Sequence, residues 1–491
     1  MINKKALVIG SGFAGLSAAI SLASKGFETT LLEKNKQIGG RARQFSESGF
    51  TFDMGPSWYW MPDVFESFFN RFGKSVSDYY NLIRLDPSYQ VVYGLNDGMP
   101  IPAKMSELEE LFNSLEPGAG LRLREFLKQA AYKYEVGINK LVYKPGRSLT
   151  EFASIKLLLD VIRMDVFQSM SKHVRKFFKH PKLIQLMEFP VLFLGALPQN
   201  TPALYSLMNY ADMSLGTWYP EGGMHKIVEA MGKLAIELGV QIKTDHAVTK
   251  IHSKNGQVSS VETSQGTFVG DVVIAGADYH HVETKLLDPA DRNYTDTYWN
   301  KRVMAPSSLL YYVGLNKRID KLLHHNLFFD TDFAPHAHNI YTDPAWPENP
   351  LFYASLTSKT DPSVAPDGHE NLFLLIPVAP GLEENEMIRT KYFDMIMARL
   401  EDYTEQSVKD SIVYYRSFAH QDFVNDYNSF KGNAYGLANT LKQTAILKPS
   451  LKSKKLKNLY FTGQLTTPGP GVPPSLISGL VVADEVEKEL Q

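Results

Sequence analysis

The sequence predicts an α/β fold in which a parallel sheet is interrupted by a long α+β insertion. Residues 6–34 have the pattern of a strand, a glycine turn, a helix and a second strand. Residues 271–278 and 458–464 each form an apolar run that ends in small residues. Between these pieces, residues 106–219 have helical patterning, and residues 286–434 alternate as strands do. The first pattern favours a parallel sheet with helices, and the last favours an antiparallel sheet.

The composition is typical of a folded protein with more than one domain. The chain has 491 residues, of which 44% are hydrophobic and 21% charged, and a formal net charge of -2. This length predicts about two to three domains. The balanced charge gives no global attraction to nucleic acid, so no nucleic-acid partner is expected. The chain contains no cysteine, which excludes disulfides, thiolate nucleophiles, iron–sulfur clusters and cysteine-ligated zinc.

The sequence predicts a cytoplasmic protein. An apolar strand begins by about Ala6, which leaves no room for the charged and apolar regions of a secretory signal. No apolar run reaches the roughly 18 to 20 residues needed to cross a bilayer. The longest runs are broken by Asp160, Asp165 and Pro190. Any contact with a membrane is therefore expected at its surface.

The N-terminal unit carries a dinucleotide-binding motif. Gly10, Gly12 and Gly15 form a GxGxxG pattern between an apolar strand and an alanine-rich helix. Gly10 permits the tight turn, Gly12 lets the backbone approach a pyrophosphate, and Gly15 lets the helix pack close to the strand. Phe13 and Ala14 lie at the helix N-terminus, where free N–H groups and the positive end of the helix dipole favour phosphates.

The residues after this motif favour FAD over NAD. Glu33 ends the second strand, where its carboxylate can accept hydrogen bonds from ribose hydroxyls and disfavours the 2′-phosphate of NADP. Lys34 follows it, and Gly40 and Arg41 then belong to a second glycine turn. Such a turn can contact a further stretch of a long, doubly phosphorylated ligand. A simple NAD dehydrogenase has no need of it.

These motifs resemble those of the FAD-dependent amine oxidase and phytoene dehydrogenase superfamily. "GSGFAG" and "LLEKNKQIGGRA" are followed by "GFTFDMGPSWY", and "LYFTGQLTTPGPGVPPSLISGLVVADEV" lies near the C-terminal end. With this last stretch the sequence is most similar to the bacterial carotenoid desaturases, above all the phytoene desaturase branch. The likeness spans nearly the whole chain. It implies a Rossmann-like FAD-binding domain of the GR2 type, with an inserted α+β substrate domain made of an antiparallel sheet and a helical cap.

Two further stretches of the chain are expected to contact FAD. Gly55 and Pro56 form a turn, and we expect Ser57 to bond to the linker of the flavin. Val248 lies where the resemblance implies a backbone bond to the adenine. Residues 271–278 contain no second GxGxxG pattern, which indicates that oxygen or a quinone, not NAD(P)H, exchanges electrons with the flavin.

A third stretch near the C-terminal end completes the expected cofactor site. By resemblance, Gly463 and Gln464 lie by the diphosphate and the ribityl chain, and Val472 lies near the isoalloxazine. A helix that starts at about Pro473 points its positive dipole end at the flavin, where it stabilises negative charge.

The three assigned stretches predict how the chain is divided. A discontinuous FAD-binding domain comprises residues 1–105, 220–285 and 435–491. Residues 106–219 form a helical cap that contacts the membrane and the substrate, and residues 286–434 form the antiparallel-sheet substrate domain.

We expect a long apolar channel between the cap and the sheet. Its aromatic lining is expected to include Tyr59, Trp60, Tyr311, Tyr312 and Phe352, although core packing is the more frequent fate of any single aromatic residue.

A basic amphipathic segment in the cap favours contact with an anionic bilayer. Lys172, Arg175, Lys176, Lys179 and Lys182 interleave with apolar and aromatic residues. A solvated helix face is the alternative interpretation. Together with a lipid-like substrate, the pattern predicts a protein associated peripherally with the inner face of the membrane.

The resemblance implies a phytoene desaturase-like enzyme of carotenoid biosynthesis that acts on a long isoprenoid polyene. A hydride moves from an allylic carbon to flavin N5, and the allylic cation then loses a neighbouring proton. The protein has to hold the substrate against the flavin and exclude water. Three alternatives remain: a 1-hydroxycarotenoid 3,4-desaturase or related carotenoid desaturase or isomerase, an FAD-dependent amine oxidase, and a flavin-fold binding protein without activity.

The sequence assigns no catalytic residue and no metal site. Asp160, Asp165, Glu188 and Asp212 lie in apolar surroundings and are candidates for a base, but each can equally cap a helix or pair with a basic neighbour. The histidines lack the helical spacing and the acidic partners of a metal-ligand set.

Overall fold

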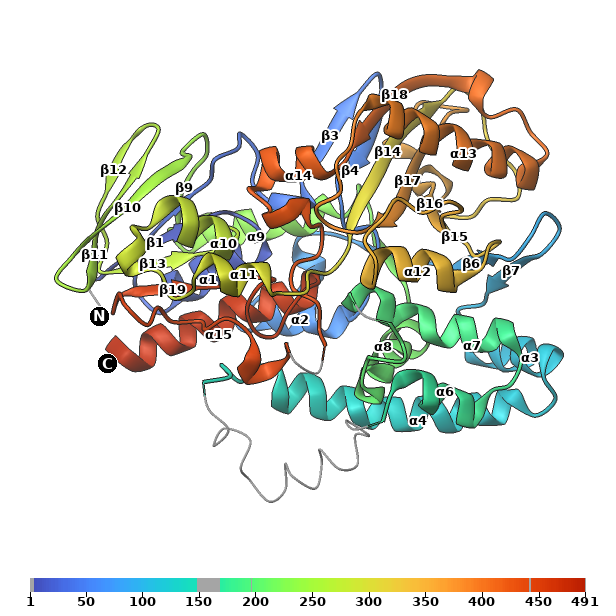
Figure 1. Cartoon of the computed structure of the whole chain (residues 1–491), viewed down its shortest axis with the longest axis horizontal. Helices are drawn as coiled ribbons and strands as arrows, with labels where there is room; N and C mark the ends of the chain where they lie inside the picture. Colours follow the sequence, from blue (N-terminus) through green and yellow to red (C-terminus); the bar gives the residue numbers. More distant parts are fainter. Residues whose placement is uncertain (1–3, 148–167, 196, 441–442, 491) are drawn as a thin grey trace.

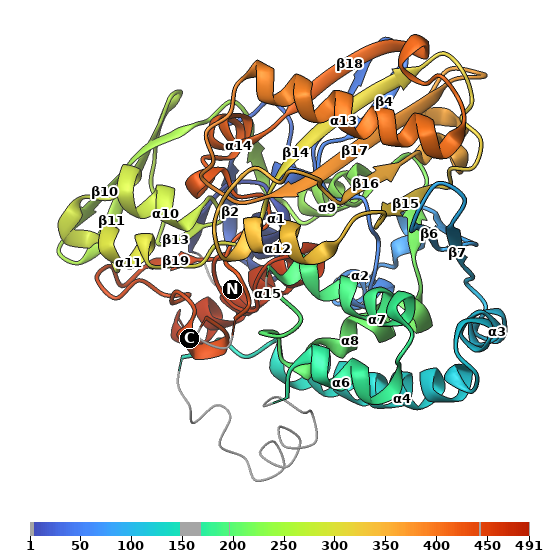
Figure 2. The same ribbon diagram turned by 45° about the vertical axis from the view of Figure 1, so that its right-hand side comes forward.

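A computed structural model describes residues 4–147, 168–195, 197–440 and 443–490. The two ends of the described chain lie close together, beside a parallel sheet (Figures 1 and 2). A second, larger sheet lies away from them, and a group of helices packs below it in Figure 1. The α/β fold class is confirmed.

The parallel sheet has five strands that are far apart in the sequence. Its order is β19-β13-β1-β2-β9, and all its pairings are parallel. The strands are β1 (Lys5–Ile9), β2 (Glu28–Leu32), β9 (Gln241–Lys243), β13 (Val272–Ala275) and β19 (Leu459–Phe461). The three apolar strands predicted from the sequence, β1, β13 and β19, lie next to one another at its centre and one edge.

Helix α1 (Phe13–Ser24) packs between the parallel sheet and the C-terminal helix α15 (Val472–Leu490). A Cβ atom on Gly479 of α15 would lie 2.3 Å from the carbonyl oxygen of Ala14. The two helices therefore touch through their backbones. Helix α9 (His225–Glu237) also packs on α1, so one face of the sheet is covered by helices from three parts of the chain.

The second sheet has seven strands in the order β18-β14-β17-β16-β15-β6-β7. All its pairings are antiparallel except β15 with β6, which is parallel. The strands are β6 (Tyr89–Val92), β7 (Gly98–Ile101), β14 (Ser307–Leu315), β15 (His325–Phe328), β16 (Phe352–Ser355), β17 (Glu370–Val378) and β18 (Ile412–Phe418). Strands β6 and β7 lie within residues 1–105, so that segment contributes to both large sheets. The three-part division of the chain stays a prediction.

Helix α13 (Glu386–Thr404) covers one face of the seven-stranded sheet. Its apolar side chains pack against the strands in a separate hydrophobic cluster. The opposite face carries side chains such as Leu310 and Leu375, which border a cavity.

Smaller elements complete the fold. A three-stranded sheet lies on the second face of the parallel sheet and consists of β10 (Val248–Lys254), β11 (Gln257–Thr263) and β12 (Gly266–Phe268). Two further sheets have two strands each. One pairs β3 (Gln44–Glu47) with β4 (Phe50–Asp53), and the other pairs β5 (Leu82–Arg84) with β8 (Trp218–Pro220). In the described part of the chain, the remaining α-helices are α2 (Pro62–Asn70), α3 (Met105–Leu115), α4 (Ala119–Val136), α6 (Met170–Phe177), α7 (Pro181–Glu188), α8 (Leu207–Tyr210), α10 (Tyr279–His281), α11 (Asp296–Asn300), α12 (Phe333–Tyr341) and α14 (His420–Tyr427).

The helices predicted for residues 106–219 are present where that segment is described, as α3, α4, α6, α7 and α8 (Figure 1). Two of the candidate bases, Asp160 and Asp165, lie outside the described residues. In the part of the chain that is described, we find no helix of sufficient length and apolarity to span a bilayer.

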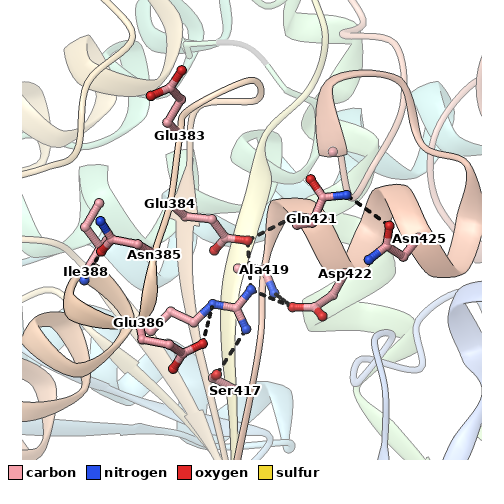
Figure 3. A network of polar contacts seen from close by, with 12 residues as sticks. Glu383, Glu384, Asn385, Glu386, Ile388, Ser417, Ala419, Gln421, Asp422 and Asn425 are labelled. Carbon is pink, nitrogen blue, oxygen red and sulfur yellow. Dashed lines mark hydrogen bonds and ion pairs between the residues drawn. The ribbon is translucent and has the colours of Figure 1, made fainter.

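An ion network joins α13 to the start of α14 (Figure 3). The guanidinium of Arg389 donates hydrogen bonds to Glu384 and to Asp422, each at 2.8 Å, and to the hydroxyl of Ser417 at 3.2 Å. Asp422 also accepts a bond from the backbone N–H of Ala419, where α14 begins. The side chains of Arg389 and Glu384 are only 12% and 7% exposed. The network therefore fixes the start of α14 beside strand β18 of the seven-stranded sheet.

We expect the variant Arg389→Met to lower the free energy of unfolding by about 3 kcal/mol, because it leaves a buried carboxylate without its cation. Lys409→Met is the matched control: its pair with Asp394 joins side chains that are 41% and 54% exposed. The control should change stability by less than about 0.5 kcal/mol. Urea unfolding of both variants measures the difference, and equal, small effects would show that the network contributes nothing.

Candidate functional site

A cavity of about 600 Å³ connects the two large sheets. At one end it is lined by the loops at the carboxyl ends of the parallel strands, where open α/β sheets bind ligands. At the other end it reaches the face of the seven-stranded sheet that α13 leaves open. Apolar side chains dominate that end, including Phe189, Met208, Leu327, Phe329, Ile340 and Leu375.

The predicted cofactor residues converge on this cavity, although they come from seven separate stretches of the chain. Those that line it are Gly10, Gly12, Phe13, Ala14, Glu33, Lys34, Gly40, Arg41, Gly55, Pro56, Ser57, Val248, Gly463, Gln464 and Val472. The exception is Gly15, which is not on the cavity wall. Its assignment as a contact residue is not supported by its position, whereas its predicted packing role fits the geometry.

The three glycines of the N-terminal motif have different surroundings. Gly10 adopts a φ of +92°, which favours glycine. A Cβ atom on Gly15 would lie 1.9 Å from the carbonyl oxygen of Gly10, so only glycine lets α1 approach this turn. A Cβ atom on Gly12 would meet nothing within 4 Å. Gly12 therefore borders open space, which fits a cradle for a phosphate at the N-terminus of α1.

Glu33 lies buried at the end of β2 and is held by local donors. Its carboxylate accepts bonds from the backbone N–H of Ser11 at 2.9 Å, from the Ser11 hydroxyl at 2.6 Å and from the N–H of Asn35 at 2.9 Å. A carboxylate has about four lone-pair positions, so capacity remains for ribose hydroxyls.

Arg41 brings a positive charge with an unused donor to the cavity wall. Its guanidinium donates to the hydroxyl of Ser429 at 3.0 Å and to the carbonyl of Asn433 at 3.2 Å. Its buried Nε has no hydrogen-bond partner among the described residues. Burial lowers the pKa of Arg41, and the nearby carboxyl of Asp278 opposes this shift. A buried N–H without a partner fits an anionic ligand, so the donor set suits the diphosphate of FAD.

A family comparison agrees with this geometry. The model of the family "Flavin containing amine oxidoreductase" matches residues 13–487. The chain belongs to this family. It is therefore an FAD-dependent oxidoreductase, as the resemblance implied.

Relatives of this flavin oxidoreductase cover nearly its whole length. It is 44% identical over 98% of both chains to the carotenoid 3,4-desaturase of Haloarcula japonica. It is 32% identical to the zeta-carotene-forming phytoene desaturase of Myxococcus xanthus, over 99% of this chain and 94% of the relative. Among solved structures, an oxidoreductase from Methanosarcina mazei matches with a TM-score of 0.63 at 17% identity, covering 98% of this chain and 100% of the other, which shows a shared fold.

Further residues that the sequence analysis missed line the end of the cavity formed by the loops of the parallel sheet, called the nucleotide end below. They are His246, Asp278, Tyr279, His281, Asp426, Tyr427 and Asn428. The sequence could have indicated Asp278, because this acidic residue comes shortly after strand β13, just as Glu33 comes after strand β2. Burial raises the pKa of Asp278 to about 6. Asp426 and Tyr427 had no local signal.

Asp426 and Tyr427 lie at the end of α14 and contact the arginines of the second glycine turn. Asp426 pairs with Arg43. The guanidinium carbons of Arg41 and Arg43 lie 5.3 Å and 5.2 Å from the centre of the Tyr427 ring, within range of a cation–π interaction. Helix α14 thus connects the region of Arg389, beside the seven-stranded sheet, to the second glycine turn.

The two candidate bases within the described residues do not line the cavity. Asp212 is buried and accepts bonds from the hydroxyls of Tyr89 at 2.7 Å and Thr217 at 3.3 Å. Burial raises the pKa of Asp212 to about 7. Glu188 forms an ion pair with Arg175. Glu188 thus pairs with a basic neighbour, which was the alternative interpretation, whereas the partners of Asp212 are two hydroxyl groups.

Only part of the expected aromatic lining is correct. Trp60 and Phe352 border the cavity. Tyr311 points to the face covered by α13, and Tyr312 donates its hydroxyl to the carbonyl of Met54. Tyr59 is fully buried beneath the cavity wall. Strand β14 is buried on both faces, so alternation of burial could not show which side chains point inward. The described residues contain no group of three or more His, Asp or Glu that could hold a metal ion.

We expect Gly12→Ala and Gly15→Ala to separate cofactor binding from folding. Gly12→Ala adds a methyl to open space, so it should weaken FAD binding at least about tenfold and leave the stability of the apoprotein within about 0.5 kcal/mol. Gly15→Ala should lower stability by about 2 kcal/mol or more, because its methyl meets a backbone oxygen. Fluorescence titration with FAD and urea unfolding measure both. Similar losses of stability in the two variants would contradict the distinction.

We expect Asp212→Asn to reduce the loss of stability between pH 4 and pH 7. The pKa of this carboxyl is raised from 3.8 to about 7 in the folded chain. As the pH rises through this window, the unfolded chain releases the proton first, so the folded state loses up to about 4 kcal/mol of stability. Urea unfolding of wild type and variant at both pH values isolates Asp212 from the other buried carboxyls. Identical pH dependence in the two proteins would refute the shift.

Proposed function

We propose that this flavin oxidoreductase is a carotenoid desaturase that dehydrogenates C–C bonds of a long isoprenoid polyene. The observation that carries the proposal is the shape and chemistry of the cavity. It begins at the FAD motifs and continues into a volume with aromatic and aliphatic walls. A lipid-like substrate suits such walls, and a polar or charged substrate would be desolvated there without partners. Both reported relatives carry carotenoid desaturase names.

We assign the cofactor contacts by the position of each group along the cavity. Glu33 and Val248 contact the adenosine end of FAD. The N-terminus of α1, at Gly12, Phe13 and Ala14, binds the diphosphate. Lys34, Gly40, Arg41, Gly463 and Gln464 surround the diphosphate and ribityl chain. Gly55, Pro56, Ser57 and Val472 take the flavin end, next to the apolar half. All of these residues line the same cavity.

FAD, when bound, supplies the acceptor for the hydride that a saturated carbon next to the polyene gives up. The chain supplies the remaining conditions. The side chains of the seven-stranded sheet hold the substrate in a fixed orientation, which lowers the entropy cost of reaching the reactive geometry. The apolar walls exclude water, which would otherwise add to a carbocation. The N-terminus of α15 at Val472 borders the same space and favours negative charge near it.

The bond that reacts can lie in the middle of the polyene chain, as in phytoene desaturation, or at its end, as in 3,4-desaturation. The relative with the higher identity, 44%, is named a carotenoid 3,4-desaturase, whereas the phytoene desaturase is 32% identical over a similar length. This difference favours 3,4-desaturation over the mid-chain steps on phytoene. Both reactions are dehydrogenations of the same substrate class.

We further propose that the enzyme works at the cytoplasmic face of a membrane, because its substrate is dissolved there. Helix α6 and the turn after it carry Lys172, Lys176 and Lys179, which face outward and can contact anionic lipid heads. Two other cations of the predicted patch are already paired: Arg175 with Glu188, and Lys182 with Asp97. The patch that remains is smaller than the sequence suggested.

We expect the holoenzyme to desaturate carotenoids in liposomes. Phytoene and a 1-hydroxylated carotene with a saturated 3,4 bond should be offered separately, with oxygen or a quinone as acceptor, and products separated by chromatography. Products with longer conjugation absorb at longer wavelength. Conversion of the hydroxylated carotene alone would select 3,4-desaturation. Reduction of the flavin by a primary amine and by neither carotenoid would refute the proposal.

A further inference from the structure

Tyr353 and His325 form a buried hydrogen-bonded pair in the apolar half of the cavity. Tyr353 lies on β16 and His325 on the neighbouring strand β15. The phenolic Oη of Tyr353 is 2.6 Å from Nδ1 of His325. Tyr353 is 6% exposed and lines the cavity, and His325 behind it is 0% exposed. The pair therefore reaches the cavity through the tyrosine alone.

The pair lies next to the stretch that we assign to the flavin end. The indole of Trp58 stacks on the His325 ring, with centroids 4.3 Å apart and planes 12° apart. Trp58 directly follows Ser57, and both line the cavity with Tyr353. Nε2 of His325 has no hydrogen-bond partner among the described residues. The Tyr353 hydroxyl is thus the polar contact that sets the tautomer of the imidazole.

His336, which also lines the apolar half, is in a different situation. Its Nδ1 accepts a hydrogen bond from the backbone N–H of Leu351 at 2.9 Å, and its Nε2 lies 2.8 Å from the carbonyl oxygen of Pro377. Nε2 must therefore carry the proton, and no lone pair remains on the ring. His336 is fixed as a structural imidazole and cannot take up a proton without losing a bond.

The carboxylates on the cavity wall lie away from the apolar half, where we place the substrate. Among the described lining residues they are Glu33, Asp278 and Asp426. All three lie at the nucleotide end, and Glu33 and Asp426 are already bonded to neighbouring groups. A dehydrogenation removes a hydride and a proton from neighbouring carbons, so an acceptor for the proton is needed near the apolar half.

We propose that Tyr353 accepts this proton from the substrate and passes its own phenolic proton to Nδ1 of His325. The inference rests on the proposed carotenoid desaturation. The C–H bond of the carbon next to the hydride donor breaks, and its electron pair becomes the new C=C bond. The proton forms a new O–H bond on Tyr353 while the former O–H proton forms the N–H bond on His325. The imidazole leaves the step as an imidazolium and returns the proton through the Tyr353 hydroxyl to the cavity after the product has left.

The surroundings keep the imidazole ready for this role. Burial, and to a smaller extent the neighbouring His324, holds the pKa of His325 well below its usual value. The ring is therefore neutral and able to accept a proton. A weak base is sufficient here, because a proton next to a carbocation is strongly acidic. Burial raises the pKa of Tyr353, so this phenol stays protonated until the proton is exchanged. Among the other titratable groups, His324 has its ring centroid 4.4 Å from that of His325, and Tyr435 acts on Tyr353.

The test combines ring spectroscopy with isotope effects on the holoenzyme. We expect the nitrogen NMR spectrum of histidine-labelled protein to show His325 neutral with an unprotonated Nδ1, and this signal to shift in Tyr353→Phe. His325→Gln identifies the signal. With a carotenoid deuterated at the carbon that loses the proton, Tyr353→Phe should turn over about 100-fold more slowly and show a larger isotope effect than wild type. The matched control is Tyr311→Phe, a buried tyrosine on the opposite face of the sheet.

The outcomes separate this inference from the proposed function. A wild-type enzyme that desaturates no carotenoid would refute the proposed function. If the wild-type enzyme desaturates a carotenoid but Tyr353→Phe shows the same isotope effect as wild type, the proposed role of Tyr353 is wrong and the proposed function stands. A protonated Nδ1 in the resting enzyme would also overturn it. Retained FAD content and stability in Tyr353→Phe distinguish a lost proton acceptor from a misfolded variant, and a slow Tyr311→Phe would indicate a general effect of the substitution.

Discussion

The close approach of α1 to its neighbours is the constraint on which the rest of the structure depends. On one side Gly15 lets α1 touch the turn after β1, and on the other Gly479 lets α15 touch α1. Backbone contacts at this distance hold the first and last segments of the chain together. Because β19 and α15 come from the C-terminal end, the loops that precede α1 and α15 meet at one place. That place is the nucleotide end of the cavity.

Helix α14 gives the two halves of the cavity a common support. Its start is fixed by Arg389 near the seven-stranded sheet, and its end presents Tyr427 to Arg41 and Arg43. A shift of this helix would move the substrate side and the cofactor side together. The cavity is therefore held as one unit, as a reaction that joins a long substrate to a fixed cofactor requires.

Local sequence signals singled out residues that line one end of the cavity, and they carried less information about the apolar end. The glycine spacing, Glu33 and the turn of Gly55 and Pro56 each depend on a single short segment, so they can be recognised in the sequence without knowledge of the fold. Tyr427 depends on contacts between residues hundreds of positions apart in sequence. The partnership of Tyr353 and His325 needs the register of β15 with β16, which no short pattern contains. Strand β14 lies within the region predicted to form strands, but burial of its side chains on both faces meant that the sequence did not show which way its tyrosines point.

The parallel pairing of β15 with β6 has a consequence for how such enzymes can change their substrates. Two strands of the seven-stranded sheet, β6 and β7, come before residues 106–219 in the sequence, and β6 pairs with β15, a strand that carries a lining residue of the cavity. Residues 286–434 therefore do not form the seven-stranded sheet by themselves. A chimera that exchanges only residues 286–434 would pair foreign strands with a native β6, and substrate preference should be transferable only when residues 89–101 travel with them.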